Sequence, residues 1–210
     1  MAQSSANPYP RYSKQWIITD KTAVEAGYVN NPNDPGGETN CGITKKLAVF
    51  YKAKLVSLFN WDGTMRNLTK PMAFYIYDME FWQKLALDDV FKRCPLIADK
   101  MFDAGINIGG SVVGKWFQLI LTVMNNQGQL YPDLVPDGNI GPRTIAAMDS
   151  YLKARGNKVG RWTILKLLLA KQGSHYVDIS FANGKLETFT QGWANRLDHN
   201  LVDYWQTLNQ

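Results

Sequence analysis

Apolar residues recur at the three- and four-residue spacing of an amphipathic helix through most of this 210-residue chain, whereas strand-type alternation is weak. The helical stretches end at clusters of Gly, Pro, Asn and Asp, and the densest cluster is NNPNDPGG at residues 30–37. Such a cluster stops a helix and favours tight turns. The pattern therefore predicts a mainly α-helical fold of six to eight helices, with one small β-hairpin or irregular loop at this cluster.

Local start and stop signals place the individual helices. Ser13 is a predicted N-cap for a first helix that ends before Gly27, and Thr44 begins a second periodic stretch that reaches Leu58. Proline is tolerated in the first turn of a helix and marks further starts. These starts are Pro71, Pro95 and Pro142, and the remaining predicted helices cover residues 112–124, 162–179 and 186–208.

The composition is that of an ordinary globular protein, because 45% of residues are hydrophobic and 20% are charged. A net charge of +5 and an isoelectric point near 9.1 suit a polyanionic partner such as a cell wall or a nucleic acid. The basic residues are scattered, however, without a run of five or six. We therefore expect no nucleic-acid partner.

The sequence lacks the features of secreted, membrane-spanning, disulfide-bonded and metal-binding proteins. Residues 1–12 are polar, read as a flexible segment and show no secretory signal. No apolar window approaches the 18 residues of a membrane span, so we expect no stable membrane insertion. Cys41 and Cys94 can pair, but two free thiols in a reducing cytoplasm are the expectation. His175 and His199 stand far apart without acidic or cysteine clusters, so we expect no metal and no cofactor.

The sharpest pair of chemically active residues is Glu25 and Asp34, which lie nine positions apart. Cleavage of a glycosidic bond needs one carboxylic acid that protonates the leaving oxygen and a second group that acts on the sugar carbon or on water. The apolar neighbours of Glu25 can raise its pKa, while Asp34 in a polar turn stays ionised. The ordinary alternatives are a solvated helix-end Glu and a turn-forming Asp. The spacing alone leaves inverting and retaining mechanisms open.

Four motifs in one order resemble glycoside hydrolase family 108, the family of bacteriophage and prophage endolysins with N-acetylmuramidase activity. The first motif combines VEAGYVN at residues 24–30 with DPGGETNCGIT at residues 34–44. The others resemble the predicted peptidoglycan-binding region of these proteins. They are FDAGINIG at residues 102–109, DGNIGPRT at residues 137–144 and FTQGWANR at residues 189–196.

The resemblance implies a lysozyme-like helical fold and a catalytic glutamate at Glu25. The family usually has Gly where this chain has Ala26, which restricts the backbone if φ is positive there. The Glu–Asp spacing is also similar to that of phage-type lysozymes, in which a threonine after the Asp helps to place water. Thr39 and Thr44 are both candidates for that role, although Thr44 is equally suited to be a helix N-cap and Thr39 to stabilise the loop.

Three further residues are candidates for substrate binding. Tyr28 and Trp193 can stack on a sugar ring, although aromatic residues at such positions are more often part of a core. Asn107 lies one helical turn after Asp103 and can bind sugar hydroxyl or N-acetyl groups, or it can tie its helix to the active-site loop. We read Cys41 as a small buried apolar residue.

The leading hypothesis from the sequence is therefore an endolysin that hydrolyses the β-1,4 bond between N-acetylmuramic acid and N-acetylglucosamine. The alternatives are a chitinase-like hydrolase and a non-catalytic peptidoglycan-binding or phage structural protein. We expect a monomer with a catalytic lobe at residues 13–108 and a helical peptidoglycan-binding-like lobe at residues 109–210, packed together. The resemblance implies synthesis in the host cytoplasm and action on peptidoglycan in the periplasm.

Overall fold

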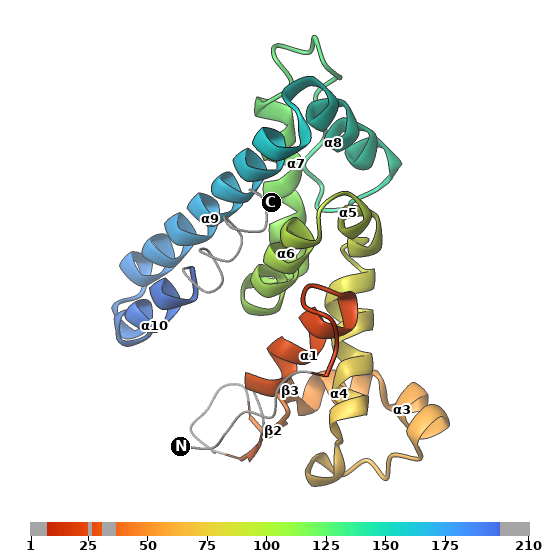
Figure 1. Cartoon of the computed structure of the whole chain (residues 1–210). Helices are drawn as coiled ribbons and strands as arrows, with labels where there is room; N and C mark the ends of the chain where they lie inside the picture. Colours follow the sequence, from red (N-terminus) through yellow and green to blue (C-terminus); the bar gives the residue numbers. More distant parts are fainter. Residues whose placement is uncertain (1–7, 25–26, 31–36, 198–210) are drawn as a thin grey trace. The chain divides into compact units, whose positions relative to one another are not determined.

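The computed structural model describes residues 8–24, 27–30 and 37–197, and its contacts divide the chain into two units, Met1–Gln83 and Lys84–Gln210 (Figure 1). The described residues form ten α-helices, three short helical turns and three short strands. The prediction of a mainly helical fold with a small β element is confirmed. The predicted lobe boundary after residue 108 and the packing of the lobes stay predictions.

The first unit is built of short helices around a small sheet. Ser13 caps the first helix as predicted, since its Oγ accepts the Trp16 backbone N–H at 3.1 Å. Ile17 and Ile18 on that helix are fully buried, and the helix packs against α4. The helices are α1 (Lys14–Val24), α2 (Lys45–Phe50), α3 (Lys52–Phe59), the 3₁₀ turn η1 (Met65–Asn67), α4 (Lys70–Tyr77) and the π-helix η2 (Asp78–Gln83).

The periodic stretch that begins at Thr44 is two helices instead of one, because the chain breaks at Tyr51. Tyr51 has φ −89° and ψ 5°, and it ends α2 and begins α3. Its hydroxyl donates to Glu80 Oε2 at 2.9 Å, and its ring meets Tyr75 edge-on at 6.2 Å. The break therefore places the Tyr51 side chain against α4 and η2, a long-range contact that helical spacing does not show.

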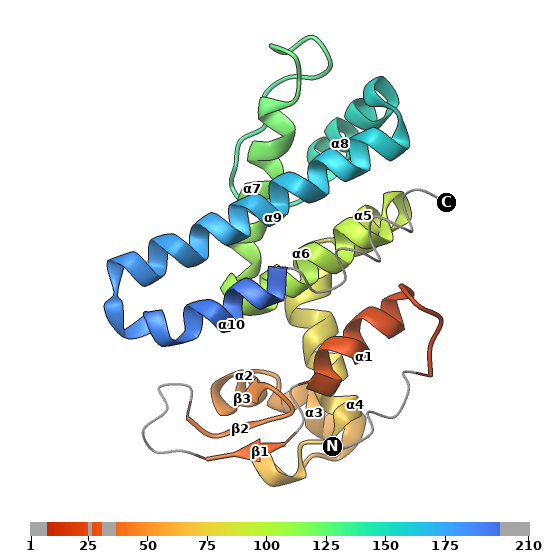
Figure 2. The same ribbon diagram turned by 60° about the vertical axis from the view of Figure 1, so that its left-hand side comes forward.

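The β element is a three-stranded antiparallel sheet in the order β1 (Tyr28–Val29), β2 (Thr39–Asn40) and β3 (Ile43–Thr44) (Figure 2). Tyr28 pairs with Asn40, and Asn40 pairs with Ile43. The two-residue turn between β2 and β3 has positive φ at both positions, 50° at Cys41 and 71° at Gly42. This is the conformation of a type I′ hairpin turn, whose twist matches that of the strands.

Asn40 attaches the sheet to the rest of the first unit. Its side-chain amide is buried and donates to the backbone carbonyls of Met65 at 2.7 Å and Leu68 at 3.2 Å. Buried polar groups are costly unless they are hydrogen-bonded. The paired amide therefore fixes β2 against η1 and sets the position of the strands on either side of it.

The second unit is a helical bundle in which α6 is central. This helix packs against α5, α7 and α9, and ten consecutive residues of it, from Leu96 to Gly105, are buried. Figure 2 shows α9 and α10 running side by side, as their contacts also indicate. The helices are α5 (Leu87–Arg93), α6 (Pro95–Ile108), α7 (Gly110–Val123), α8 (Pro142–Arg155), α9 (Asn157–Ala182), the 3₁₀ turn η3 (Gly184–Leu186) and α10 (Glu187–Leu197).

The turn before α8 is attached to α7 through a buried glutamine. Gln118 Nε2 donates to Asp137 Oδ1 at 2.9 Å and to the Asn139 carbonyl at 3.0 Å, and its Oε1 accepts the Gly138 N–H at 2.8 Å. Gly114 lies one turn earlier on α7, and the Gly138 carbonyl fills the space that a Cβ there would need. The DGNIGPRT motif is therefore a fold element that fixes the start of α8.

Candidate functional site

The sheet of the first unit brings together three of the residues predicted from the sequence. Tyr28 lies in β1, Thr39 in β2 and Thr44 in β3, and Thr39 is the register partner of Thr44. Glu25 and Asp34 lie outside the described residues. In the sequence, Glu25 follows α1 directly and Asp34 falls in the connection between β1 and β2. The two predicted carboxylates therefore belong to the segments that lead into and out of β1.

Glu38 is the described carboxylate of this segment, and both its oxygens are engaged. Tyr28 Oη donates to Oε1 at 2.9 Å, and Lys45 Nζ lies 2.9 Å from Oε2. The Lys45 backbone N–H also donates to the Glu38 carbonyl at 2.8 Å. The ammonium group of Lys45 and the hydroxyl of Tyr28 hold the pKa of Glu38 below its usual value, and the carboxylate of Glu38 in turn raises the pKa of Lys45. Glu38 is therefore an ionised group that links the start of β2 to β1 and α2.

The ring of Tyr28 is covered on one face by Arg66, whose Cζ lies 4.1 Å from the ring centroid. A guanidinium over an aromatic face is attracted by the ring quadrupole. Arg66 comes from η1, the turn to which Asn40 also attaches β2. The tyrosine ring is thus held by Arg66 on one face and by its hydroxyl bond to Glu38.

Thr44 is the N-cap of α2. It has extended backbone angles, φ −72° and ψ 151°, and its Oγ1 accepts the Leu47 N–H at 3.3 Å. This confirms the capping alternative for Thr44. Its predicted role in placing water stays a prediction, as does that of Thr39.

Asn107 and Trp193 lie in the second unit. The Asn107 side-chain amide donates to the Asp103 carbonyl of its own helix at 2.7 Å. Trp193 on α10 stacks on Tyr176 at 5.4 Å and on Phe189 at 5.9 Å. These contacts give both residues a structural role in the bundle. Their predicted binding roles stay predictions.

Asp103 joins two of the motifs within the second unit. Its carboxylate is buried and lies 3.4 Å from Lys100 Nζ and 4.0 Å from Arg196 Nη1. Asp103 belongs to the motif at residues 102–109 and Arg196 to the motif at residues 189–196. The ion pair therefore connects α6 with α10.

Sequence reasoning missed the residues that hold the sheet. Glu38 lies inside the first motif. Its position as an acidic residue beside the predicted catalytic loop could have identified it as a residue of the site. Lys45 offered no signal beyond its charge. Arg66 and Asn40 reach their partners across 38 and 25 positions in the sequence, and no local pattern marks such contacts.

The described residues contain no group of three or more His, Cys, Asp or Glu side chains that could hold a metal ion. In the same part of the chain, no helix is both long and apolar enough to cross a bilayer. Cys41 and Cys94 are buried free thiols, and burial raises the pKa of each. Cys41 is thus the small buried residue that the sequence indicated.

Residues 19–109 match the family model described as Glycosyl hydrolase 108, and residues 113–198 match one described as Predicted Peptidoglycan domain. A solved structure, "Structure of Brucella abortus SagA", is 25% identical over 87% of this chain and 88% of that chain, with a TM-score of 0.58. No curated protein sequence matches the chain. The lysozyme-like fold that the motifs implied is confirmed. The chain therefore carries a glycosyl hydrolase 108 domain at residues 19–109, followed at residues 113–198 by a predicted peptidoglycan-binding domain.

Proposed function

We propose that this protein is an N-acetylmuramidase that hydrolyses the β-1,4 bond between N-acetylmuramic acid and N-acetylglucosamine in peptidoglycan. Two observations support the substrate class. The glycosyl hydrolase 108 match covers residues 19–109, and the match to a predicted peptidoglycan domain follows at residues 113–198. A net charge of +5 also favours association with an anionic cell wall, with an attraction that salt screens.

The ionised, bonded carboxylate of Glu38 is the observation that supports the choice of general acid. The first motif contains three acidic residues, Glu25, Asp34 and Glu38. A general acid near neutral pH needs a raised pKa and a proton to donate. Glu38 has a lowered pKa and is committed to Lys45 and Tyr28. Glu25, at the position of the family's catalytic glutamate, is therefore the proposed proton donor.

The remaining roles follow from the chemistry of glycoside hydrolysis. Asp34 stays ionised and either holds the attacking water or stabilises the positive charge that develops on the sugar. Thr39 or Thr44 helps to place that water. The Tyr28–Glu38–Lys45 contacts, together with Arg66, hold β1 and β2 in register at the two ends of the connection that carries Asp34.

The biological setting is also a proposal. The protein acts as a phage endolysin that is made in the host cytoplasm, reaches the peptidoglycan in the periplasm as a monomer and causes host lysis. The motif resemblance supports this setting. The competing hypotheses are a chitinase-like hydrolase with the same acid and a protein that binds peptidoglycan without cleaving it.

Fragment analysis separates these hypotheses. Purified peptidoglycan is incubated with the protein, and the released fragments are reduced with borohydride and analysed by mass spectrometry. The proposal predicts reduced N-acetylmuramic acid at the new ends. Reduced N-acetylglucosamine at those ends would indicate a glucosaminidase. Cleavage of chitin oligomers in a parallel incubation, with no new ends released from peptidoglycan, would indicate a chitinase-like enzyme. No release of ends from either substrate would indicate a protein that only binds peptidoglycan.

A further inference from the structure

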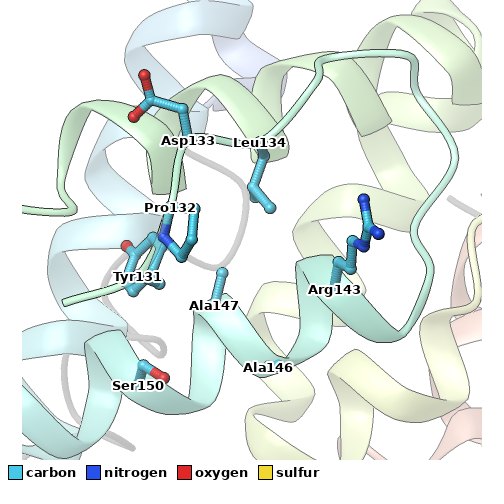
Figure 3. Close-up of a pocket in the computed structure, with 8 residues that line it drawn as sticks. All are labelled: Tyr131, Pro132, Asp133, Leu134, Arg143, Ala146, Ala147 and Ser150. Carbon is cyan, nitrogen blue, oxygen red and sulfur yellow. The ribbon is translucent and has the colours of Figure 1, made fainter. Parts of the chain in front are cut away.

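A pocket lies within the second unit, between the segment of residues 131–134 and α8 (Figure 3). Its volume is about 320 Å³, at the lower end of the range of small-ligand sites. It is lined by Tyr131, Pro132, Asp133, Leu134, Arg143, Ala146, Ala147 and Ser150. The side chains of Leu134 and Ala147 point into the space between the segment and the helix. The pocket thus has a small, mostly apolar floor.

The wall formed by residues 131–134 is fixed by three bonds to α7 and the turn that follows it. Tyr131 Oη donates to the Leu121 carbonyl at 2.8 Å, and the Leu134 N–H donates to Thr122 Oγ1 at 3.1 Å. Asn125 Nδ2 donates to Asp133 Oδ1 at 2.6 Å. A site that is held open before its ligand arrives loses less free energy on binding. The pocket is therefore preformed.

The charges around the pocket favour an anion. Arg143 is exposed, rises along one side of the pocket and has no hydrogen-bond or ion-pair partner within the described ranges (Figure 3). The carboxylate of Asp133 points away from the pocket toward its partner Asn125. Burial raises the pKa of Tyr131 to about 12, so its phenol adds no negative charge. One unpaired guanidinium then faces a ligand, and the planar guanidinium fork matches the geometry of a carboxylate or a phosphate.

The lining fits a peptide better than a sugar. A carbohydrate presents many hydroxyl groups, and it needs several polar partners and an open aromatic face. Here Ser150 and Arg143 are the polar groups that are not already bonded in the described structure, and the ring of Tyr131 is buried. Methyl-sized side chains pack well on a floor of Leu134, Pro132 and Ala147. A short chain of small residues with a free carboxylate matches this combination.

We propose that this pocket binds the peptide stem of peptidoglycan, with Arg143 pairing with a stem carboxylate and the alanine methyl groups lying on the apolar floor. The inference rests on the proposed function, because it takes peptidoglycan as the substrate. It assigns to the second domain recognition of the peptide, while the first domain cleaves the glycan. The second domain then directs the protein to peptidoglycan whose peptide stems are intact.

Calorimetric titration of the full-length protein tests the pocket. The probes are a synthetic alanine-containing stem tetrapeptide with free carboxylates, the same peptide with its carboxylates amidated, and the peptide-free disaccharide of N-acetylglucosamine and N-acetylmuramic acid. The free-acid peptide is expected to bind, and loss of a charge-assisted pair in Arg143→Gln is expected to weaken it by about tenfold or more. Lys153→Gln, an exposed change of the same charge on the same helix, should stay within about twofold of the parent.

A second variant tests the floor without removing a buried group. Ala146 is exposed and lines the pocket, so Ala146→Leu adds bulk in the pocket and replaces none of the buried side chains of α8. It should weaken peptide binding as Arg143→Gln does. Binding of the free-acid peptide by both variants as tightly as by the parent protein would overturn the inference. So would binding of the disaccharide but not the peptide, binding of the amidated peptide as tightly as the free-acid peptide, or no peptide binding at millimolar concentration.

Failure of the inference is distinguishable from failure of the proposed function. The titration uses peptides that a glycoside hydrolase does not cleave. A protein that releases new reducing ends from peptidoglycan but does not bind the peptide contradicts only the assignment of the pocket. A protein that binds the peptide through Arg143 but releases no reducing ends contradicts the proposed activity alone.

Discussion

Replacing Gly114 by alanine tests the attachment of the turn before α8 to α7. A Cβ at this position would lie 2.3 Å from the Gly138 carbonyl oxygen and 2.9 Å from its carbon, and both atoms are backbone. Ordinary contact begins at 3.4 Å, so the turn has to move by about 1 Å. That movement strains the buried bond from the Gly138 N–H to Gln118.

The cost follows from three effects of this substitution. Overpacking of a close contact costs about 1–3 kcal/mol, and weakening the buried hydrogen bond adds about 1 kcal/mol. The higher helix propensity of alanine returns about 1 kcal/mol. The net destabilisation is about 1–3 kcal/mol, which corresponds to a fall in melting temperature of about 2–12 °C in a protein of this size.

Gly192→Ala is the matched control for this measurement. Gly192 lies in α10, and nothing lies within 4 Å of the Cβ that alanine would add. Thermal unfolding followed by circular dichroism should show a melting temperature that is equal to or slightly above the parent's for Gly192→Ala and below it for Gly114→Ala. A Gly114→Ala protein as stable as the Gly192→Ala protein would contradict the close packing of the turn on α7.

Three further predictions concern the first unit. Asp34→Ala should reduce the release of reducing ends severely but less than loss of Glu25 does; full turnover with a lower melting temperature would instead assign Asp34 to turn formation. Thr44→Ala should lower stability by about 0.5–2 kcal/mol while Thr44→Ser keeps it, because serine also caps a helix; equal melting of the two variants would remove the cap from the account. The folded state depresses the pKa of Glu38, so its contribution to stability is present above the usual value of 4.5 and is lost as the pH falls through the lower folded value. The difference in melting temperature between the parent and Glu38→Gln should therefore narrow from pH 7 to pH 3, and a constant difference would show that its charge contributes nothing.

Helix starts were the most predictable part of the fold. Ser13, Thr44 and the proline in the first turn of α8 act locally, because each signal involves only the first turn of its own helix. The break at Tyr51 could not be predicted in the same way, because its side chain is held by α4 and η2. The helix α5 was also missed, since its seven residues are too short for a clear period.

The sheet was predicted only as a hairpin or loop. Each of its strands has two residues, which is too short for the alternation that identifies a strand. The turn places Cys41 at φ 50°, a conformation that sequence rules assign to Gly, Asn or Asp. The third strand was therefore not predicted, and Thr44 was predicted only as the start of a helix.

The candidate site was predictable where a motif supplied it. Tyr28, Thr39 and Thr44 belong to the first motif and share the sheet. The contacts that hold the Tyr28 side chain come from Arg66 and from Glu38, which also pairs with Lys45 of α2, and they depend on how β1 pairs with β2. Such pairing follows from the folded chain as a whole, so local sequence patterns do not contain it.

Release of new reducing ends from purified peptidoglycan by Glu25→Gln tests the central claim most directly. An amide keeps the shape of the side chain but cannot donate the proton, and loss of general-acid catalysis costs on the order of 100-fold or more. Glu187→Gln, the same change at an exposed position of α10, serves as the control. The account predicts a melting temperature close to the parent's for both variants, at least a 100-fold slower release for Glu25→Gln and an unchanged rate for Glu187→Gln. A folded Glu25→Gln protein that releases reducing ends at nearly the parent's rate would contradict it.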